Sequence, residues 1–188
     1  MKKIFIMAIS AMLCLASASA WDGERKGFQM GIGFGGGFDS YSGIRYDSLG
    51  SGEDDHSGIA FTALPRIGFA FTNRIALYYS RHPFTYVVEN ESGKDVNITT
   101  CIESIHMDYY LRDSAPSLFF GLGAGVGYFM DDDTLNWSED ALKGPGVFGT
   151  IGFEPVKHIT TELSVHYKSQ QSGASNLGVS LIVSAIGY

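Results

Sequence analysis

The feature that most constrains this chain is an alternation of glycine with large apolar residues. Between Leu118 and Tyr128 the even positions carry Leu, Phe, Leu, Ala, Val and Tyr, while glycine occupies positions 121, 123, 125 and 127. The stretch Gly27–Gly35 repeats the pattern, with Phe, Met, Ile and Phe on its even positions. Side chains alternate between the two faces of a β-strand, so this period of two predicts strands with one bulky apolar face and one face of minimal volume.

Six further segments show the same period of two, and little of the chain follows helical spacing. The eight predicted strands cover approximately residues 27–35, 59–71, 74–86, 104–111, 118–128, 147–153, 159–168 and 176–188. In the last segment, Leu177 and Val183 share one parity, whereas Ile186 and Tyr188 share the other. Either a bulge shifts the register near Ser184 or this strand is apolar on both faces.

The connections between the predicted strands alternate in length. The long ones cover roughly residues 39–58, 88–100, 130–145 and 169–175, and the short ones lie near 72–74, 112–117 and 154–158. Eight antiparallel strands place all four long connections at one end and all three short ones at the other. An even number of strands with short turns at one end and long loops at the other is typical of an outer-membrane barrel.

The second face of the strands distinguishes a membrane barrel from a soluble one. A soluble barrel keeps its apolar side chains inside and exposes polar ones. Here the apolar face is opposed by glycine, serine and threonine with a few charges, which suits a narrow interior and leaves the bulky face for lipid. Closure also leaves no unpaired sheet edge in hydrocarbon. We predict an all-β fold, an eight-stranded antiparallel up-and-down transmembrane β-barrel with four long outer loops and short periplasmic turns.

Two local features accompany this prediction. Pro65 has no N–H for the strand ladder and predicts a bend in the second strand. Aromatic residues near strand ends fit the two interfacial girdles of a membrane barrel. The predicted girdle residues are Phe71, Tyr79, Tyr86, Tyr109, Phe119, Tyr128, Phe153 and Tyr167.

The first 20 residues have the pattern of a cleaved bacterial signal peptide, which predicts a mature barrel domain of residues 21–188. A basic start precedes the largely apolar stretch 4–16, and Ala18–Ala20 fits the cleavage site. Leu13 before Cys14 opposes a lipid anchor, and Cys101 is the only thiol left, so no internal disulfide can form. The mature chain carries 11 basic and 20 acidic residues, a net charge near −9, which opposes binding to nucleic acid.

The export signal, the glycine-alternating strands, the asymmetric loops and the terminal aromatic Tyr188 together resemble the small eight-stranded outer-membrane proteins. This superfamily includes the OmpA transmembrane domain, OmpX and the opacity proteins, and the resemblance covers the whole mature chain. It implies that Ile186 and Tyr188 form a C-terminal signal read by the barrel-assembly machinery. Val183 stands where that signal usually has glycine.

Six ionisable residues fall on the inward parity of strands two, four and seven, while Glu103 falls on the outward parity. A charge inside a narrow barrel must be paired or hydrated. These residues therefore predict a salt-bridged polar plug, with a gated narrow pore or a proton-handling site as alternatives. The predicted lumen cluster is Arg66, His106, Asp108, Glu162, His166 and Lys168.

An enzymatic alternative rests on the segment from His166 to Gln170. The lipid A 3-O-deacylase family carries a His-x-Ser-Asn motif late in the chain, with an acidic residue beyond it. Here Ser169 lies one residue too far from His166, Gln170 replaces the asparagine, and no acidic residue follows. Strand parity also places His166 inward and Ser169 outward. The two side chains then cannot form the hydrogen bond by which a histidine activates a serine as a nucleophile.

Two acidic clusters lie in the first and third long connections. Oxygen-rich loops can bind Ca²⁺ or Mg²⁺, but the spacing here does not match the EF-hand pattern. The clusters are therefore either solvated acids or a divalent cation site that orders the loops near lipopolysaccharide. The candidate loop cation site is Glu53, Asp54, Asp55, Asp131, Asp132 and Asp133.

The expected role is non-enzymatic, in envelope structure or surface interaction (adhesion) through the acidic outer loops. The alternatives are a narrow pore for ions or small solutes and a lipid A-modifying enzyme. We expect a monomer in the bacterial outer membrane, with no cofactor. The expected partners are outer-membrane lipid and lipopolysaccharide, the barrel-assembly machinery and an extracellular ligand at the loops.

Overall fold

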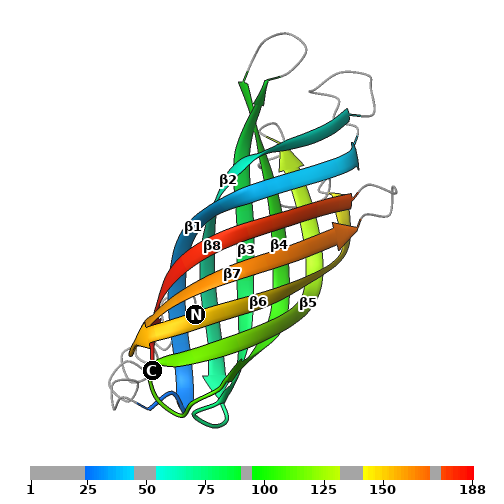
Figure 1. Ribbon diagram of the computed structural model, residues 1–188. Helices are drawn as coiled ribbons and strands as arrows, with labels where there is room; N and C mark the ends of the chain where they lie inside the picture. Colours follow the sequence, from blue (N-terminus) through cyan, green and yellow to red (C-terminus); the bar gives the residue numbers. More distant parts are fainter. Residues whose placement is uncertain (1–23, 45–53, 90–94, 132–141, 170–174) are drawn as a thin grey trace, which may run out of the picture.

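The computed structural model of the protein describes residues 24–44, 54–89, 95–131, 142–169 and 175–188. Each strand pairs antiparallel with its neighbours in the chain, and the last strand pairs with the first, so the sheet closes into an eight-stranded up-and-down barrel (Figure 1). The predicted fold class is confirmed. The strands are β1 (Gly27–Ile44), β2 (Asp54–Ala70), β3 (Ile75–Glu89), β4 (Asp95–Tyr110), β5 (Ser117–Asp131), β6 (Leu142–Val156), β7 (Ile159–Ser169) and β8 (Ser175–Gly187).

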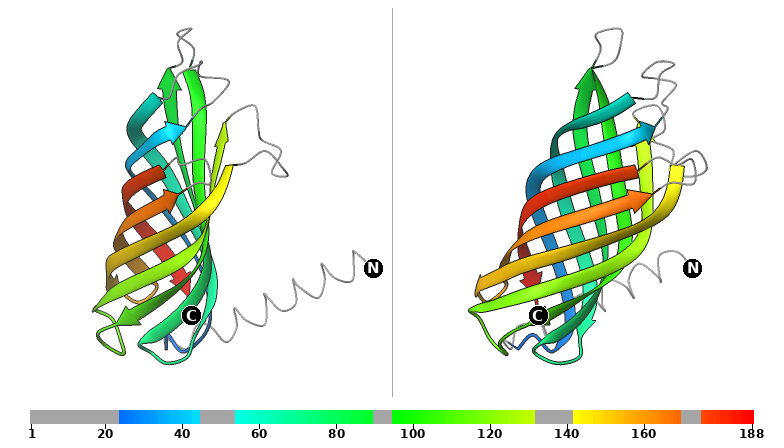
Figure 2. Two further views of the ribbon diagram at one scale, coloured as in Figure 1. Left: turned by 90° about the vertical axis from the view of Figure 1, so that its right-hand side faces the viewer. Right: turned by 45° about the vertical axis from the view of Figure 1, so that its right-hand side comes forward.

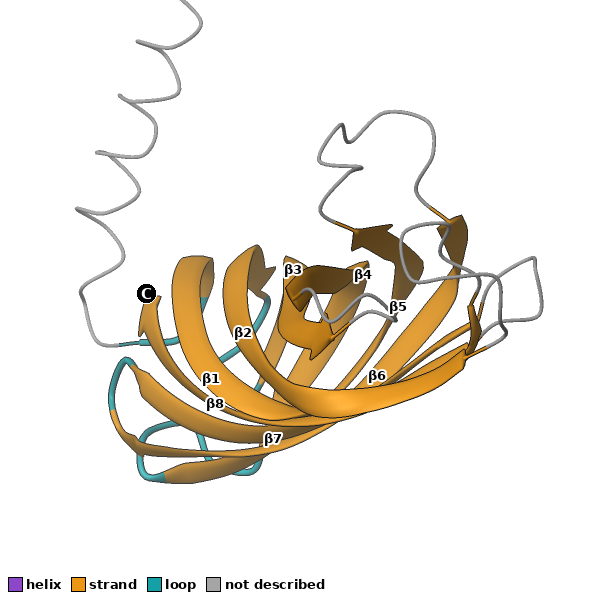
Figure 3. Cartoon of the chain, turned by 90° about the horizontal axis from the view of Figure 1, so that it is seen from above, coloured by secondary structure: helices purple, strands orange, loops and turns teal. Residues whose placement is uncertain are grey.

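Every regular element in the described part of the chain is a strand (Figure 3). The described residues contain no helix that is long and apolar enough to cross a membrane. The three short turns lie at one end of the barrel, beside the start of β1 and the end of β8 (Figure 1). We call this the turn end. The strand ends that flank the other four connections lie at the opposite, loop end, as predicted.

The strands are longer than the apolar pattern predicted, and the connections at the loop end shrink to residues 45–53, 90–94, 132–141 and 170–174. The β3–β4 hairpin reaches furthest at the loop end (Figure 2). Toward that end the outward positions carry polar residues, including Ser57, Thr85 and Thr99. The hydroxyls of Thr85 and Thr99 lie 3.1 Å apart across the β3–β4 pair. Apolar periodicity therefore ends before the strands do.

Two of the short turns are tied together by an exposed ion pair. The Arg74 guanidinium, after β2, donates to both carboxylate oxygens of Asp113, after β4, at 2.8 and 3.0 Å. These hydrogen bonds lower the pKa of the Asp113 carboxyl. Both side chains are largely in solvent, so the pair contributes little to stability.

The outer surface of the barrel is apolar on all eight strands. Among its most exposed side chains are Ile59 at 78%, Phe61 at 77% and Leu122 at 74% of their full accessible area. A water-soluble protein rarely exposes a contiguous apolar surface of this kind. The arrangement matches the outward apolar band of a membrane barrel.

The interior contains more large side chains than the glycine-rich inward face of the sequence predicted. Buried aromatic rings stand beside glycines on neighbouring strands: Phe119 of β5 faces Gly152 of β6, and a Cβ added at Gly152 would overlap the Phe119 ring. Phe148 faces Gly123 in the same way. The glycines thus provide the volume that the rings occupy.

Two of the predicted girdle residues are wrong. Tyr86 and Phe119 lie inside the barrel, at 2% and 0% exposure, because each has the inward parity of its strand. The outward position beside Phe119 belongs to Phe120, which is exposed. Phe71, Tyr79, Tyr109, Phe153 and Tyr167 are exposed on the outer surface, and Tyr128 is half-buried there.

The last strand is apolar on both faces. Its burial alternates without interruption from Ser175 to Gly187, and its pairing with β1 runs without a register shift. Of the two alternatives left open by the sequence, the bulge near Ser184 is therefore wrong. Ile182, Ile186 and Tyr188 point into the barrel and are nearly fully buried.

The ring-against-glycine packing predicts that Gly152→Ala destabilises the barrel. We expect a loss of about 1–3 kcal/mol in the free energy of unfolding, because the new methyl overpacks the Phe119 ring. The measurement is urea unfolding of the refolded barrel in lipid vesicles, followed by circular dichroism. Gly149→Ala in the same strand is the matched control, since the nearest atom to its Cβ is 3.7 Å away. Equal losses in the two variants would contradict the packing argument.

Candidate functional site

The turn-end half of the barrel interior holds an ion-paired cluster from four strands, which we call the middle cluster because it lies between the two others described below. Arg66 of β2 forms an ion pair with Glu162 of β7, and its Nη1 lies 3.7 Å from the Asp108 carboxylate of β4. Ser184 of β8 accepts from Arg66 Nη2 at 2.7 Å and donates to Glu162 at 3.2 Å. The three charged side chains are at most 3% exposed. Such a cluster fixes four strands relative to one another, because each charge needs its partners to remain buried.

A second polar cluster lies nearer the loop end. His166 Nε2 is 3.1 Å from Asp39 Oδ1 and 3.2 Å from Asn176 Oδ1. Both neighbours are acceptors, so we assign the hydrogen to Nε2. Lys168 Nζ donates to the Thr100 hydroxyl at 2.7 Å, and that hydroxyl donates to Asp39 Oδ2 at 3.0 Å. Asp39 thus joins the histidine and lysine into one network across β1, β4, β7 and β8.

Aromatic rings fill the space between these two clusters. Tyr78 stacks on His106 with ring centroids 5.0 Å apart, and Phe148 meets both His106 and His82 edge-on at 5.2 and 5.4 Å. Phe84 lies 4.1 Å from the His166 ring and beneath Lys168. These contacts place a packed layer of phenyl, phenol and imidazole rings between the two charged clusters.

A third cluster closes the turn end of the barrel. Arg25, just before β1, forms a buried ion pair with Glu154 of β6. Its Nη1 also donates to the carbonyl oxygens of Asn73 at 2.9 Å and Arg112 at 2.7 Å, in two different turns. The guanidinium stacks 4.1 Å from the centre of the Tyr110 ring, and Glu154 also accepts from the Tyr188 hydroxyl. One arginine therefore joins the N-terminal segment, two turns and the C-terminus.

The structure places all six predicted lumen residues inside the barrel, but in two clusters. Arg66, Asp108 and Glu162 form the middle one, with His106 Nε2 3.8 Å from Asp108. His166 and Lys168 belong to the second. Glu103 lies on the outer surface as its parity predicted, where it pairs with Arg81 at 3.3 Å.

Sequence reasoning missed several members of these clusters. Asp39 and Thr100 fell in predicted connections, although Asp39 continues the inward odd parity of the first strand. Glu154 had inward parity but was placed at a strand end without a partner. Arg25 precedes the first strand, where no periodicity exists to orient it.

The enzymatic and metal hypotheses gain no support from the geometry. His166 is buried and hydrogen-bonded to Asp39, whereas Ser169 has the outward parity of β7 and is half-exposed, so the two do not form a nucleophile–base pair.

Of the loop cation residues, Glu53, Asp132 and Asp133 lie outside the described residues, while Asp54, Asp55 and Asp131 lie at strand ends. Among the described residues, no group of three or more His, Cys, Asp or Glu side chains could hold a metal ion. Cys101 is a buried free thiol.

A closed eight-stranded barrel with a charged interior and an apolar exterior has the architecture of the small outer-membrane barrel proteins, as the resemblance implied. No protein-family model matches the chain, and no curated protein sequence matches it significantly. Solved structures do match. Ail, the attachment invasion locus protein of Yersinia pestis, solved with the heparin analogue sucrose octasulfate, is 14% identical with a TM-score of 0.58; the match covers 86% of this chain and 99% of Ail. Neisserial surface protein A is 14% identical with a TM-score of 0.55, over 85% of this chain and 97% of its own. These similarities show the fold.

Proposed function

We propose that this chain is a non-enzymatic integral outer-membrane barrel whose role is structural or in surface interaction through its loops. The observation that carries the proposal is the filled interior. A charged cluster at the turn end, one in the middle and one toward the loop end alternate with packed aromatic rings. An interior occupied in this way offers no aqueous path, so the chemistry available to partners lies on the outside of the barrel.

The outer surface supports the membrane location. Exposed apolar side chains lie on every strand, and hydrocarbon is the environment that solvates them. The predicted signal peptide supplies the export route. The C-terminal residues Ile186 and Tyr188 remain the proposed assembly signal, although both side chains point into the barrel.

The loops are the proposed interaction surface. Ail, named for attachment and invasion, has the same fold and was solved with a polysulfated ligand. The first and third connections of this chain instead carry two acidic clusters, the same residues as the candidate loop cation site. Like charges repel such a ligand. We therefore propose that the loops bind a partner that is cationic or bridged by divalent cations, and not a polysulfated ligand of this kind.

Planar-bilayer recording tests the closed interior directly. We expect the refolded barrel to produce no steady conductance, because the three clusters and the rings between them fill the lumen. Stable single-channel steps would overturn the proposal in favour of a narrow pore.

A second measurement, mass spectrometry of lipid A from cells lacking and cells overproducing the protein, tests for enzymatic activity. A change of one acyl chain would instead establish a lipid-modifying enzyme.

A further inference from the structure

The pairing between β2 and β3 is interrupted partway along the two strands. The two strands pair from Arg66 to Ala70 and again at Phe61 and Thr62, with the same register on both sides. No pair is recorded between the intervening residues 63–65 of β2 and 81–83 of β3, all of which are described. The ladder between β2 and β3 is therefore interrupted over three residue pairs, and no bulge shifts its register.

Two prolines explain the interruption. The amide of Phe71 donates to the carbonyl of Ile75, so odd-numbered residues of β2 form the hydrogen-bonded pairs with β3. By that register Pro65 stands opposite Arg81, and Pro83 stands opposite Ala63. Both prolines fall at positions that should donate across the seam, and neither has an N–H. Pro65 keeps its place in the pairing with β1, opposite Ile32, so the bend predicted there stays a prediction; the interruption affects only the β3 side, where Pro83 adds a second missing donor.

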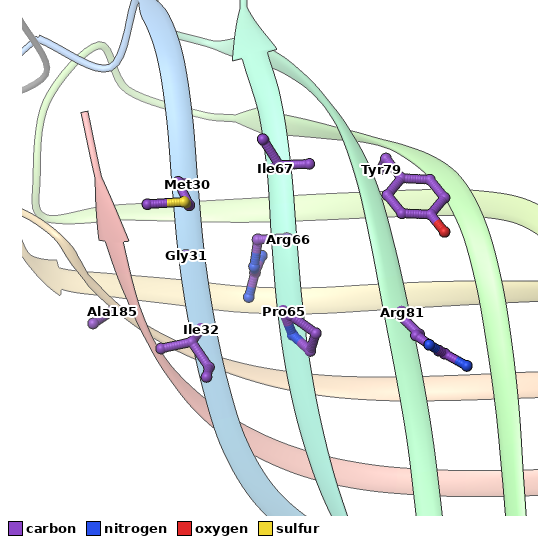
Figure 4. Close-up of a pocket in the computed structure, with 9 residues that line it drawn as sticks. All are labelled: Met30, Gly31, Ile32, Pro65, Arg66, Ile67, Tyr79, Arg81 and Ala185. Carbon is purple, nitrogen blue, oxygen red and sulfur yellow. The ribbon is translucent and has the colours of Figure 1, made fainter. Parts of the chain in front are cut away.

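An apolar groove of about 590 Å³ lies on the outer surface over this seam (Figure 4). Most of its lining side chains form two rows. One row lies nearer the turn end, and the other lies two residue pairs toward the loop end, with Arg81 at its edge on β3. Gly31 and Arg66 line the groove between the two rows. The apolar lining is Met30, Ile67 and Tyr79 in the first row and Ile32, Pro65 and Ala185 in the second.

Arg81 and Glu103 form a polar pair on the outer surface, on the loop side of the groove. The Arg81 guanidinium lies 3.3 Å from Glu103, which also accepts a 3.4 Å hydrogen bond from the Tyr128 hydroxyl; the Arg81 and Glu103 side chains are 30% and 28% exposed. An arginine facing lipid is destabilising at the centre of a bilayer and nearly neutral at its interfaces. On β3 the outward residues run from Leu77 and Tyr79 through Arg81, Pro83 and Thr85 to Val87, which is again apolar and exposed. The ion pair and the hydroxyls of Tyr128, Thr85 and Thr99 gather on the loop side of the groove, and such a polar group suits the headgroup level.

We propose that this groove binds one acyl chain of a phosphorylated outer-leaflet lipid, with the lipid phosphate on Arg81. The inference rests on the proposed membrane location. A groove that opens toward hydrocarbon and is lined by apolar side chains fits a lipid chain, and guanidinium groups bind phosphate oxygens. Because the cation lies on the loop side, the headgroup points outward and the chain toward the turn end. That orientation assigns the ligand to the outer leaflet, whose phosphorylated lipid in this membrane is the lipid A part of lipopolysaccharide.

The test is native mass spectrometry of the full refolded barrel in detergent micelles, titrated separately with bisphosphorylated lipid A, dephosphorylated lipid A, phosphatidylglycerol and inorganic phosphate. We expect one molecule of bisphosphorylated lipid A to be retained. Arg81→Gln should weaken its binding about tenfold, as expected for a lost charge-assisted hydrogen bond. Glu103→Gln should strengthen it, because the competing carboxylate is gone. Ala185→Phe should weaken both forms of lipid A, because the new ring fills the groove.

Lys157→Gln is the matched control, since it removes an exposed cation in the β6–β7 turn that does not line the groove. Heat-dependent gel mobility confirms that each variant is folded. Equal lipid A binding by all variants would overturn the site, as would retention of inorganic phosphate alone or a preference for phosphatidylglycerol. A barrel that folds and stays non-conducting but shows one of these results would disprove the lipid site while leaving the proposed function intact.

Discussion

Replacing Arg66 by methionine is expected to lower the free energy of unfolding by about 3–5 kcal/mol, among the largest single effects in this barrel. The substitution keeps most of the side-chain volume but removes the only cation paired with Glu162 and Asp108 in the described middle cluster. Both carboxylates are nearly fully buried. They would lose the charge that offsets their desolvation. Urea unfolding in lipid vesicles measures the loss.

The exposed pair between Arg74 and Asp113 provides the control for Arg66. Arg74→Met removes the same kind of side chain from the same kind of ion pair, but in solvent at the turn end. We expect its unfolding midpoint to stay close to that of the unmodified protein. A second comparison combines Arg66→Met with Glu162→Gln and Asp108→Asn, which removes the unpaired charges and should recover part of the loss. If Arg66→Met and Arg74→Met behaved alike, the buried cluster would not be the determinant of stability proposed for it.

The Arg66 cluster shows how far the sequence alone can predict the site. Inward parity was sufficient to place Arg66, Asp108 and Glu162 in the lumen, because a strand fixes the side of each residue within a few positions of its centre. Parity does not indicate how far along the barrel axis an inward residue lies. Which inward residues meet depends on the register between strands, and β7 contributes Glu162 to one cluster and His166 to another.

The residues that were missed share a physical cause. Asp39 follows Gly35–Gly37, where glycine also occupies the outward position 36 and interrupts the alternation, and Thr100 lies beside the outward, polar Thr99; in both places the apolar signal that defines a strand is weakened. The pairing of Phe119 with Gly152 joins residues far apart in sequence and follows from the β5–β6 register. A lone glycine on an inward face indicates that space is needed, but not which ring will fill it.

The two prolines at the β2–β3 seam are a further case in which the sequence predicts a local feature but not the strand pairing around it. Pro65 alone predicts a disturbed strand. Only the pairing reveals that Pro83 removes a second donor from the next hydrogen-bonded pair, so that two consecutive pairs each lack a donor. The interrupted pairing lies under an apolar groove with a cation at its edge, and this combination supports lipid binding on the outer surface.

Arg25 gives the second large effect, at the turn end. Arg25→Ala is expected to lower the free energy of unfolding by about 3–5 kcal/mol, because Glu154 is 1% exposed and would lose its cation inside the barrel. The substitution also removes the hydrogen bonds to the Asn73 and Arg112 carbonyls and the stacking on Tyr110. Urea unfolding of the refolded barrel measures this loss as well.

Lys26→Ala is the matched control for Arg25, because the neighbouring side chain is exposed and its contact to Asn73 is made by the backbone amide. The barrel should remain non-conducting in Arg25→Ala, since the middle cluster and the aromatic rings still fill the lumen. A double-mutant cycle with Glu154→Ala separates the ion pair from the rest. If the buried pair is what holds the N-terminal segment against β6, the double variant should lose less than the sum of the single losses. Additive losses would show that Arg25 acts through the turn carbonyls and Tyr110, with Glu154 held independently by Tyr188.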